Sequence, residues 1–417
     1  MTPERFTDFG IADPILRAVL ARGYTIPTPI QLRSIPAQMA GKDVLGIAQT
    51  GTGKTAAFVL PILHCLSRPS CAANRRRPRA LVLAPTRELA IQIGDSVRAY
   101  SAHLDLHHTV VFGGVKDRPQ ITALERGTDI VVATPGRLLD LVRRGKADLS
   151  GIECLVLDEA DRMLDMGFIR DIRALIAALP TDRQSLLFSA TMPKEISRLA
   201  DSLLNSPVRV EVAPQSTPVE RIKQSVLHVS AIEKTAKLSE LLADNSLEKV
   251  IVFTRTKHRA NRVSEQLMKR GIDSEAIHGN KSQGARQRAL DAFKNGGTRV
   301  LVATDIAARG IDIEAVSHVI NYELPNEPES YVHRIGQTAR AGASGSAVSL
   351  CDPAERTYLR DIERTIGLEL TVIGDSPPES EEVPPRRRGR PQRHRELDAA
   401  KPLANQRRRP RRRRRAA

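Results

Sequence analysis

The sequence contains no tryptophan, and aromatic residues make up only 3% of its 417 positions. It therefore lacks an interleaved aromatic and basic stripe of the kind that stacks single-stranded bases. The four cysteines have no CxxC spacing, so we expect no metal site built on thiols, and Cys154 and Cys351 lie in apolar runs typical of core thiols. No apolar run approaches the ~18 residues that span a bilayer, and the first ten residues lack the apolar segment of a signal peptide. These absences favour a reduced, intracellular protein that does not associate with membranes.

Positive charge is concentrated at the C-terminal end of the sequence. Residues 386–417 contain fourteen arginines and one lysine against two acidic residues, which accounts for +13 of the net charge of +16. The segment has too few apolar residues to form a core, so it is predicted to be disordered. Such a tail binds polyanions without sequence preference and with strong salt dependence. A solubilising role is the alternative.

Short apolar runs alternate with helical patterns along most of the chain, which is typical of parallel sheets covered by helices on both faces. We therefore predict an α/β fold with two domains at residues 1–211 and 221–368, a linker at 212–220 rich in Pro, Ser and Thr, and a tail at 369–417. Strands are expected at 43–48, 80–84, 109–113, 129–133, 154–158, 185–189, 249–254, 299–303, 318–322 and 346–350.

A glycine-rich stretch, AQTGTGKT (48–55), follows the first predicted strand and precedes a helical pattern. Gly51 and Gly53 permit a backbone that cradles phosphates, Lys54 can reach the β- and γ-phosphates, and the Thr55 hydroxyl can ligate Mg²⁺. The strict phosphate-loop pattern has glycine at the first position, where this chain has alanine. A glycine-rich turn with a chance lysine is the alternative for the loop alone. The other loop residues expected to contact the nucleotide are Ala48, Gln49, Thr50 and Thr52.

The stretch CLVLDEAD (154–161) is an aliphatic strand that ends in three acids within four residues. Asp158 is expected to position Mg²⁺, and Glu159 to polarise the water that attacks the γ-phosphate. A helix N-terminus explains one acid but not three. Together with the glycine-rich loop, these acids predict a site that hydrolyses a nucleoside triphosphate.

The segment GYTIPTPIQ (23–31) offers a candidate base-recognition residue. The Gln31 amide has one donor and one acceptor face, which match the N6/N7 edge of adenine. Tyr24 and Phe6 are nearby aromatic residues that can pack against such a ring. On the residues alone, an ordinary turn is the alternative for Gln31.

The chain resembles the DEAD-box family of ATP-dependent RNA helicases over about residues 1–365. The motifs that carry the resemblance are GYTIPTPIQ (23–31), AQTGTGKT (48–55), PTRELA (85–90), GG (113–114), TPGR (134–137), DEAD (158–161), SAT (189–191), VIVFTRT (250–256), ATDIAARGID (303–312) and HRIGQTARAG (333–342). Within the family, AIHGNKSQGAR (276–286) and the basic tail look most like the bacterial RhlE-type branch.

The resemblance implies two RecA-like domains that close on ATP and RNA together, with ATP and Mg²⁺ as cofactors. It implies adenine recognition by Gln31, ribose contact by Asp312, coupling of hydrolysis to strand separation by Ser189 and Thr191, and a position facing the cleft for His333 and Arg340. Arg340 is the candidate arginine finger. The residues implied to bind the RNA backbone are Arg87, Gly114, Thr134, Gly136, Arg137, Gln283, Arg286 and Thr304.

The resemblance implies an RNA-stimulated ATPase that unwinds short duplexes locally or remodels RNA–protein complexes. Contacts to the RNA backbone predict that it does so with little sequence preference. Two other functions stay open: an RNA-binding or annealing factor that relies on its tail, and a DNA translocase. Family members usually carry arginine where this chain has Gln337, so a weakened hold on the closed state is expected. We expect a monomer in a bacterial cytoplasm, with ribosomal particles or RNA-decay proteins as possible partners.

Overall fold

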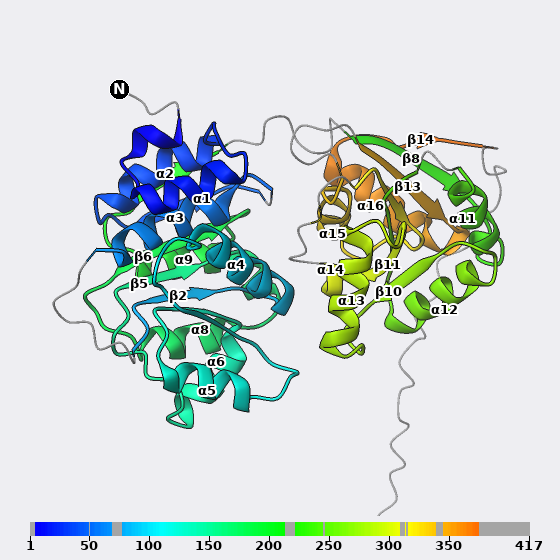
Figure 1. Ribbon diagram of the computed structural model, residues 1–417. Coiled ribbons are helices and arrows are strands. Elements are labelled where there is room, and N and C mark those ends of the chain that lie inside the picture. The colour runs from blue at the N-terminus through cyan, green and yellow to red at the C-terminus, as the bar shows by residue number, and fades with distance from the viewer. Residues whose placement is uncertain are drawn as a thin grey trace, which may run out of the picture. The chain divides into compact units, whose positions relative to one another are not determined.

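The computed structural model describes residues 5–49, 51–68, 77–212, 222–244, 247–308, 313, 316–338 and 345–374. Most of the predicted linker and tail therefore lie outside the described residues, as do Thr50, Asp312 and Arg340. Two seven-stranded parallel sheets form the scaffold, one in each predicted domain (Figure 1). The predicted α/β class with two RecA-like domains is confirmed.

The first sheet has the strand order β3-β4-β2-β5-β6-β1-β7, and every pairing is parallel. Its strands are β1 (Val44–Ile47), β2 (Ala80–Leu83), β3 (His108–Val111), β4 (Ile130–Ala133), β5 (Cys154–Leu157), β6 (Gln184–Ser189) and β7 (Val208–Glu211). Its helices are η1 (Phe6–Phe9), α1 (Asp13–Ala21), α2 (Pro29–Met39), α3 (Lys54–Leu66), α4 (Arg87–Tyr100), α5 (Arg118–Arg126), α6 (Pro135–Arg143), α7 (Ala160–Asp165), α8 (Ile169–Ile176) and α9 (Lys194–Leu203).

Both faces of this sheet are buried because successive side chains of a strand point to opposite faces. Val156 of β5 packs with α2, α3 and α4 in one cluster, whereas Leu155 and Leu157 pack with α6, α8 and α9 in the other. Figure 1 shows α2 and α3 on one side of β2 and β5, and α6 and α8 on the other. Continuous aliphatic runs such as CLVL follow directly from this double burial.

The second sheet has the order β10-β11-β9-β12-β13-β8-β14. Its strands are β8 (Ile222–His228), β9 (Val250–Thr254), β10 (Ser274–Ile277), β11 (Val300–Thr304), β12 (His318–Asn321), β13 (Gly345–Cys351) and β14 (Thr371–Val372). Its helices are α11 (Lys234–Leu242), α12 (Lys257–Met268), α13 (Gln283–Lys294), α14 (Asp305–Ala308), α15 (Pro328–Ile335), η3 (Pro353–Glu355) and α16 (Arg356–Ile366).

All ten predicted strands are present, but four strands were not predicted: β7, β8, β10 and β14. Three of them lie at sheet edges, where one side of the strand has no neighbour and continuous aliphatic sequence is not required. β8 carries Lys223 and Gln224, which hide its apolar pattern. β14 pairs with β8 inside the segment predicted as tail, so the sheet extends to Val372.

A buried ion cluster joins three segments of the second domain. The Lys234 ammonium at the start of α11 contacts the Glu355 carboxylate, lies 3.2 Å from Asp352 Oδ2 and donates to the Tyr322 carbonyl at 3.1 Å. The lysine is 2% exposed. A charge buried this deeply needs its partners, so the cluster fixes α11 against the chain around η3 and the end of β12.

Among the described residues, no helix has the length and apolar character required to cross a bilayer.

Candidate active site

The glycine-rich loop connects β1 to α3 at the carboxyl edge of the first sheet. Gly51 and Gly53 have φ values of +80° and +88°, which glycine adopts without strain. Lys54 begins α3 and is 6% exposed, and its ammonium donates to the Ala48 carbonyl at 3.0 Å. The Thr52 hydroxyl donates to the Gln49 carbonyl at 2.7 Å, which closes the turn. The loop thus has the left-handed glycines and the buried cation of a phosphate cradle.

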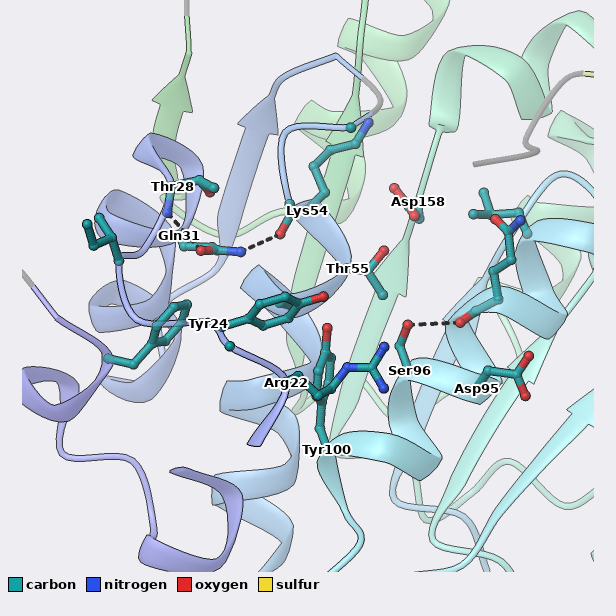
Figure 2. Close-up of a pocket in the computed structure, with 18 of the residues that line it drawn as sticks. Arg22, Tyr24, Thr28, Gln31, Lys54, Thr55, Asp95, Ser96, Tyr100 and Asp158 are labelled. Carbon is teal, nitrogen blue, oxygen red and sulfur yellow. Dashed lines mark hydrogen bonds between the residues drawn. The ribbon is translucent and has the colours of Figure 1, made fainter. Parts of the chain in front are cut away.

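Gln31, in the first turn of α2, is bonded to this loop. Its Nε2 donates to the Gly53 carbonyl at 3.0 Å, and its Oε1 accepts from the Thr28 backbone N–H at 2.8 Å (Figure 2). A carboxamide has two N–H groups and two lone pairs, so each end can form one further hydrogen bond. The contact is tight, because a Cβ at position 53 would lie 2.6 Å from Gln31 Nε2. Gln31 can therefore read a base and hold the phosphate loop at the same time.

Aromatic side chains line the same pocket. Tyr24 and Phe6 both border it, together with Gln31, Lys54 and Asp158. Figure 2 shows the Tyr24 ring between Gln31 and a second tyrosine, Tyr100 of α4. The two tyrosine ring centroids are 6.3 Å apart, and the Arg22 guanidinium lies 6.0 Å from the Tyr100 centroid. Burial raises the pKa of Tyr100. Arg22 and Tyr100 were not predicted to lie here, because no motif contains them.

The acids after β5 lie in the pocket with Lys54 and Thr55. Burial raises the pKa of Asp158 to about 6, with the Lys54 ammonium opposing the shift and Glu159 adding to it. Asp158 Oδ1 accepts from the Glu159 backbone N–H at 3.0 Å. Glu159 has a left-handed backbone, with φ +52° and ψ +53°, and its carboxylate pairs with the Arg162 guanidinium at 3.0 Å. Left-handed backbone in a residue other than glycine stores strain, and such strain clusters at functional sites.

The third acid, Asp161, bonds to the SAT segment after β6. Its Oδ2 accepts from the backbone N–H of Thr191 at 2.9 Å and from the Thr191 hydroxyl at 2.8 Å. The Ser189 hydroxyl accepts from the Asp161 N–H at 3.2 Å and donates to the Thr191 carbonyl at 2.7 Å. The sequence analysis assigned coupling to Ser189 and Thr191 but not to Asp161. Its place in the DEAD stretch was the available signal.

Three loops expected to bind RNA assemble beside β3, β4 and β2, which are neighbours in the sheet. Arg87 begins α4, and a Cβ at Gly114 would meet its guanidinium at 2.1 Å, so the two loops are in contact. Arg137 donates to the Val115 carbonyl at 3.2 Å. Thr134 is the N-cap residue of α6, whose first turn contains Gly136. Basic groups and loop backbone thus share one edge of the first domain.

In the second domain, the expected RNA-binding residues occupy the corresponding sheet edge. Thr304 ends β11, and Gln283 and Arg286 lie in the first turn of α13. The Ser282 hydroxyl caps that helix by accepting from the Ala285 N–H at 3.3 Å.

The HRIGQTARAG segment begins in α15, which contains its first arginine, Arg334. Arg334 is 1% exposed and pairs bidentately with Asp305 at 2.5 and 2.7 Å. It also donates to Asn321 Oδ1 at 3.1 Å and lies 5.1 Å from the Phe253 ring centroid. Arg334 therefore holds the domain core. Arg340, the predicted finger, lies outside the described residues.

His333 and Gln337 occupy the last turn of α15 and the turn that follows it. Gln337 is buried, and its Nε2 donates to the His333 carbonyl at 3.3 Å. The glutamine amide therefore caps a helix carbonyl of its own segment, which a guanidinium can also do.

The donors of the first-domain pocket fit a magnesium–nucleotide. A left-handed glycine cradle and a buried ammonium suit phosphates, and a hydroxyl beside a strand-end carboxylate suits Mg²⁺. No group of three or more His, Cys, Asp or Glu side chains that could hold a metal occurs in the described ranges. A magnesium ion here therefore relies on few protein ligands and on phosphate and water oxygens, as this ion prefers.

A phosphate loop after β1, acids after β5 and two RecA-like sheets define a P-loop ATPase with paired domains. The DEAD/DEAH box helicase model matches residues 28–199, and the helicase conserved C-terminal domain model matches residues 233–342. The chain belongs to the DEAD-box helicase family.

Two curated relatives illustrate the similarity. The ATP-dependent RNA helicase CshA of Listeria monocytogenes is 45% identical over 87% of this chain and 68% of its own length. The DEAD-box ATP-dependent RNA helicase CshA of Geobacillus kaustophilus is 44% identical over 86% of this chain and 76% of its own. These relatives are of the CshA type, so they support the family without supporting the RhlE-type branch that the sequence analysis favoured.

Solved structures agree with the family. Dbp5 of S. cerevisiae bound to RNA and ADP BeF3 is 32% identical, with a TM-score of 0.79 over 89% of this chain and 96% of that one. Mss116p bound to ssRNA and AMP-PNP is 28% identical, with a TM-score of 0.79 over 89% and 79% of the two chains.

Proposed function

We propose that the protein is an RNA-stimulated ATPase and RNA helicase that separates short duplexes locally or remodels RNA–protein complexes. The observation that carries the proposal is that one pocket gathers Gln31, Lys54 and Asp158, while Asp161 bonds the adjoining acid stretch to the SAT segment. The names of the CshA relatives and the RNA-bound states of Dbp5 and Mss116p support the same reading.

Each pocket residue has a role in this proposal. Gln31 reads the adenine edge, and Lys54 neutralises phosphate charge. Thr55 and Asp158 would hold Mg²⁺, which when bound offsets charge on the phosphates. Glu159, which lines the same pocket, orients the attacking water. Tyr24 packs beside the base.

RNA binding is proposed to use both sheet edges. In the first domain Arg87, Gly114, Thr134, Gly136 and Arg137 supply backbone amides, a hydroxyl and guanidinium groups, which suit phosphate and sugar more than base edges. In the second domain Gln283, Arg286 and Thr304 are proposed to do the same. Closure of the domains on ATP and RNA would bring Asp312 to the ribose and Arg340 to the γ-phosphate, and His333 to the cleft.

The first test is RNA unwinding as a function of duplex length. Local strand separation without translocation predicts that the yield falls steeply beyond about two helical turns, because closure disrupts only the bound stretch. A yield that holds steady with length would contradict the proposal. ATPase stimulated equally by DNA and RNA would instead favour a DNA translocase.

A second test separates the helicase from an annealing factor that relies on its tail. Deletion of residues 386–417 should raise the RNA concentration needed for half-maximal ATPase while leaving the maximal rate within about twofold, because the tail supplies electrostatic affinity alone. Loss of RNA-stimulated ATPase at saturating RNA would favour the annealing factor.

A third test concerns Gln337. An arginine at this position would add a cation near the cleft, so Gln337→Arg should raise RNA-stimulated ATPase or lower the ATP requirement. Arg340→Ala should abolish most activity. Unchanged or reduced activity of Gln337→Arg would show that the glutamine does not weaken the closed state of the enzyme.

The branch of the family, the localisation and oligomeric state, and the protein partners are proposed as well. The RhlE-type placement depends on AIHGNKSQGAR and the basic tail, and the CshA matches weigh against it. A bacterial cytoplasmic monomer is proposed because the curated relatives are bacterial. Ribosomal particles or RNA-decay proteins are proposed partners, to be identified by crosslinking in cells.

A further inference from the structure

One charged pair of the first domain differs from the other ion pairs formed three residues apart. Arg162 of α7 contacts Glu159 at 3.0 Å, and the side chains are only 8% and 4% exposed. The comparable pairs Arg98–Asp95, Lys237–Glu240 and Arg364–Asp361 have side chains between 44% and 78% exposed. Exposed pairs contribute little to stability, whereas a buried pair strongly constrains both partners.

The pair also lies where the chemistry is proposed to occur. Glu159 and Arg162 both line the pocket that contains Lys54 and Asp158. Among the described residues, Arg162 is the side chain that hydrogen-bonds to the Glu159 carboxylate, and it occupies only Oε2. The other oxygen, Oε1, keeps its lone pairs for a water.

The backbone adds a second constraint at the same residue. Glu159 is one of two described residues other than glycine with positive φ, and its N–H is bonded to Asp158 Oδ1. The left-handed turn sets the direction of the side chain at its root, and the guanidinium fixes its far end. A carboxylate held at both ends has one orientation, which is what the alignment of an attacking water requires.

We propose that Arg162 is a positioning residue that orients the Glu159 carboxylate for water activation. This inference rests on the proposed function of Glu159 and adds a residue to it. Arg162 acts through Glu159 and does not bind the nucleotide, so its removal should lower the rate of hydrolysis and leave nucleotide affinity unchanged.

The test compares Arg162→Met and Arg162→Lys in the full chain with Mg-ATP and saturating RNA. Arg162→Met should lower kcat about 10- to 100-fold, in the range that misplacement of a catalytic group costs. KM for ATP and the affinity for a fluorescent ADP should stay within about twofold. Arg162→Lys, which keeps a cation, should recover part of kcat. Arg364→Met, which breaks an exposed pair of the second domain, is the matched control and should keep wild-type kcat.

A double substitution makes the test specific. In a Glu159→Gln background, Arg162→Met should lower the residual rate by less than about twofold, because the residue it positions no longer acts as a carboxylate. Equal fold losses in both backgrounds would overturn the proposal, as would an unchanged kcat in Arg162→Met. A loss confined to nucleotide affinity would make Arg162 a phosphate ligand instead.

Two further measurements keep the outcomes distinct. If Arg162→Met unfolds below the assay temperature, the Arg162→Lys and Arg162→Gln variants decide, and equal kcat in both would overturn the inference. If the wild type hydrolyses ATP without stimulation by RNA, the proposed helicase function fails. The comparison of variants then proceeds on the basal rate, and it still tests the positioning of Glu159.

Discussion

Replacing Gly53 by alanine tests the link between Gln31 and the phosphate loop. Two costs add at this position. At φ +88° an alanine adopts a left-handed backbone, which costs about 1–2 kcal/mol. Its Cβ would also lie 2.6 Å from Gln31 Nε2, which forces the amide away from the Gly53 carbonyl and costs about 1 kcal/mol for the lost hydrogen bond. We expect the free energy of unfolding to fall by about 2–3 kcal/mol.

Gly145→Ala isolates the backbone cost. Gly145 also has positive φ, at +63°, but no atom lies within 4 Å of the position its Cβ would take. The control should therefore lose only about 1–2 kcal/mol. Gly53→Ala should in addition bind ATP about tenfold more weakly, because it displaces Gln31, the residue proposed to read the base, whereas Gly145→Ala should bind ATP as wild type does.

The assay is urea unfolding followed by circular dichroism, on the transition that shifts when ATP is added. In a Gln31→Ala background the closest contact of the added Cβ, to Gln31 Nε2, is absent and Thr28 Oγ1 at 3.1 Å remains, so the cost of Gly53→Ala should fall by about 1 kcal/mol, toward that of Gly145→Ala. An identical cost of Gly53→Ala in both backgrounds would refute the argument that the two residues are in tight contact.

Three other predictions follow from buried charges. Asp161→Ala removes both hydrogen bonds to Thr191, so duplex unwinding should fall about tenfold or more while basal ATPase changes far less. Thr191→Ser, which keeps the hydroxyl, is the control. Parallel losses of both activities would contradict the coupling role. Burial raises the pKa of Asp158 from its usual value to about 6, so the folded state holds this proton more tightly than the unfolded state and stability falls as pH rises from 4 to 6. Asp158→Asn should therefore stabilise the nucleotide-free protein at pH 7.5 by up to about 3 kcal/mol, a gain that shrinks toward pH 4 in urea unfolding; no gain at pH 7.5 would contradict it. Lys234→Met takes the ammonium from Asp352 and from the buried Glu355, which keeps Arg255 at 3.1 Å, so it should cost about 2–3 kcal/mol, below the ~3–5 of a fully uncompensated buried charge. Lys237→Met on the surface should cost less than about 0.5 kcal/mol, and similar costs would contradict the burial argument.

The central strands could be predicted because double burial leaves a strong signal. Runs such as ALVL and CLVL have no polar residue; prolines at positions 78 and 85 flank the first run, and the acidic DEAD stretch follows the second. β10 (Ser274–Ile277) and β14 (Thr371–Val372) carry no such run. Their positions are determined by pairing with the neighbouring strands of the sheet: β10 pairs with β11, and β14 pairs with β8. Pairing between segments distant in the chain cannot be predicted from the local sequence of either segment.

The residues of the candidate site were predictable where a motif implies a ligand. Lys54, Gln31 and Asp158 were expected in one pocket, and the structure places them there. Partners among the side chains were not predictable. Nothing in the sequence distinguishes Arg162, which is bonded to an acid, from an ordinary helix arginine, and nothing in it shows that the charged Arg334 is buried.

The bidentate pair of Arg334 and Asp305 has a consequence for how the second domain can change through evolution. A guanidinium cannot shed its charge, and this one is 1% exposed, so replacing Asp305 alone strands a buried cation. Replacing Arg334 alone leaves Asp305, whose side chain is 24% exposed, and the buried Asn321 without the guanidinium. Replacing Asp305 costs on the order of 3–5 kcal/mol, about the margin by which a domain stays folded, and replacing Arg334 costs less because water still reaches the carboxylate. The two positions are therefore expected to change together. The ion pair between the start of α14 and α15 should be kept in descendants that keep the fold.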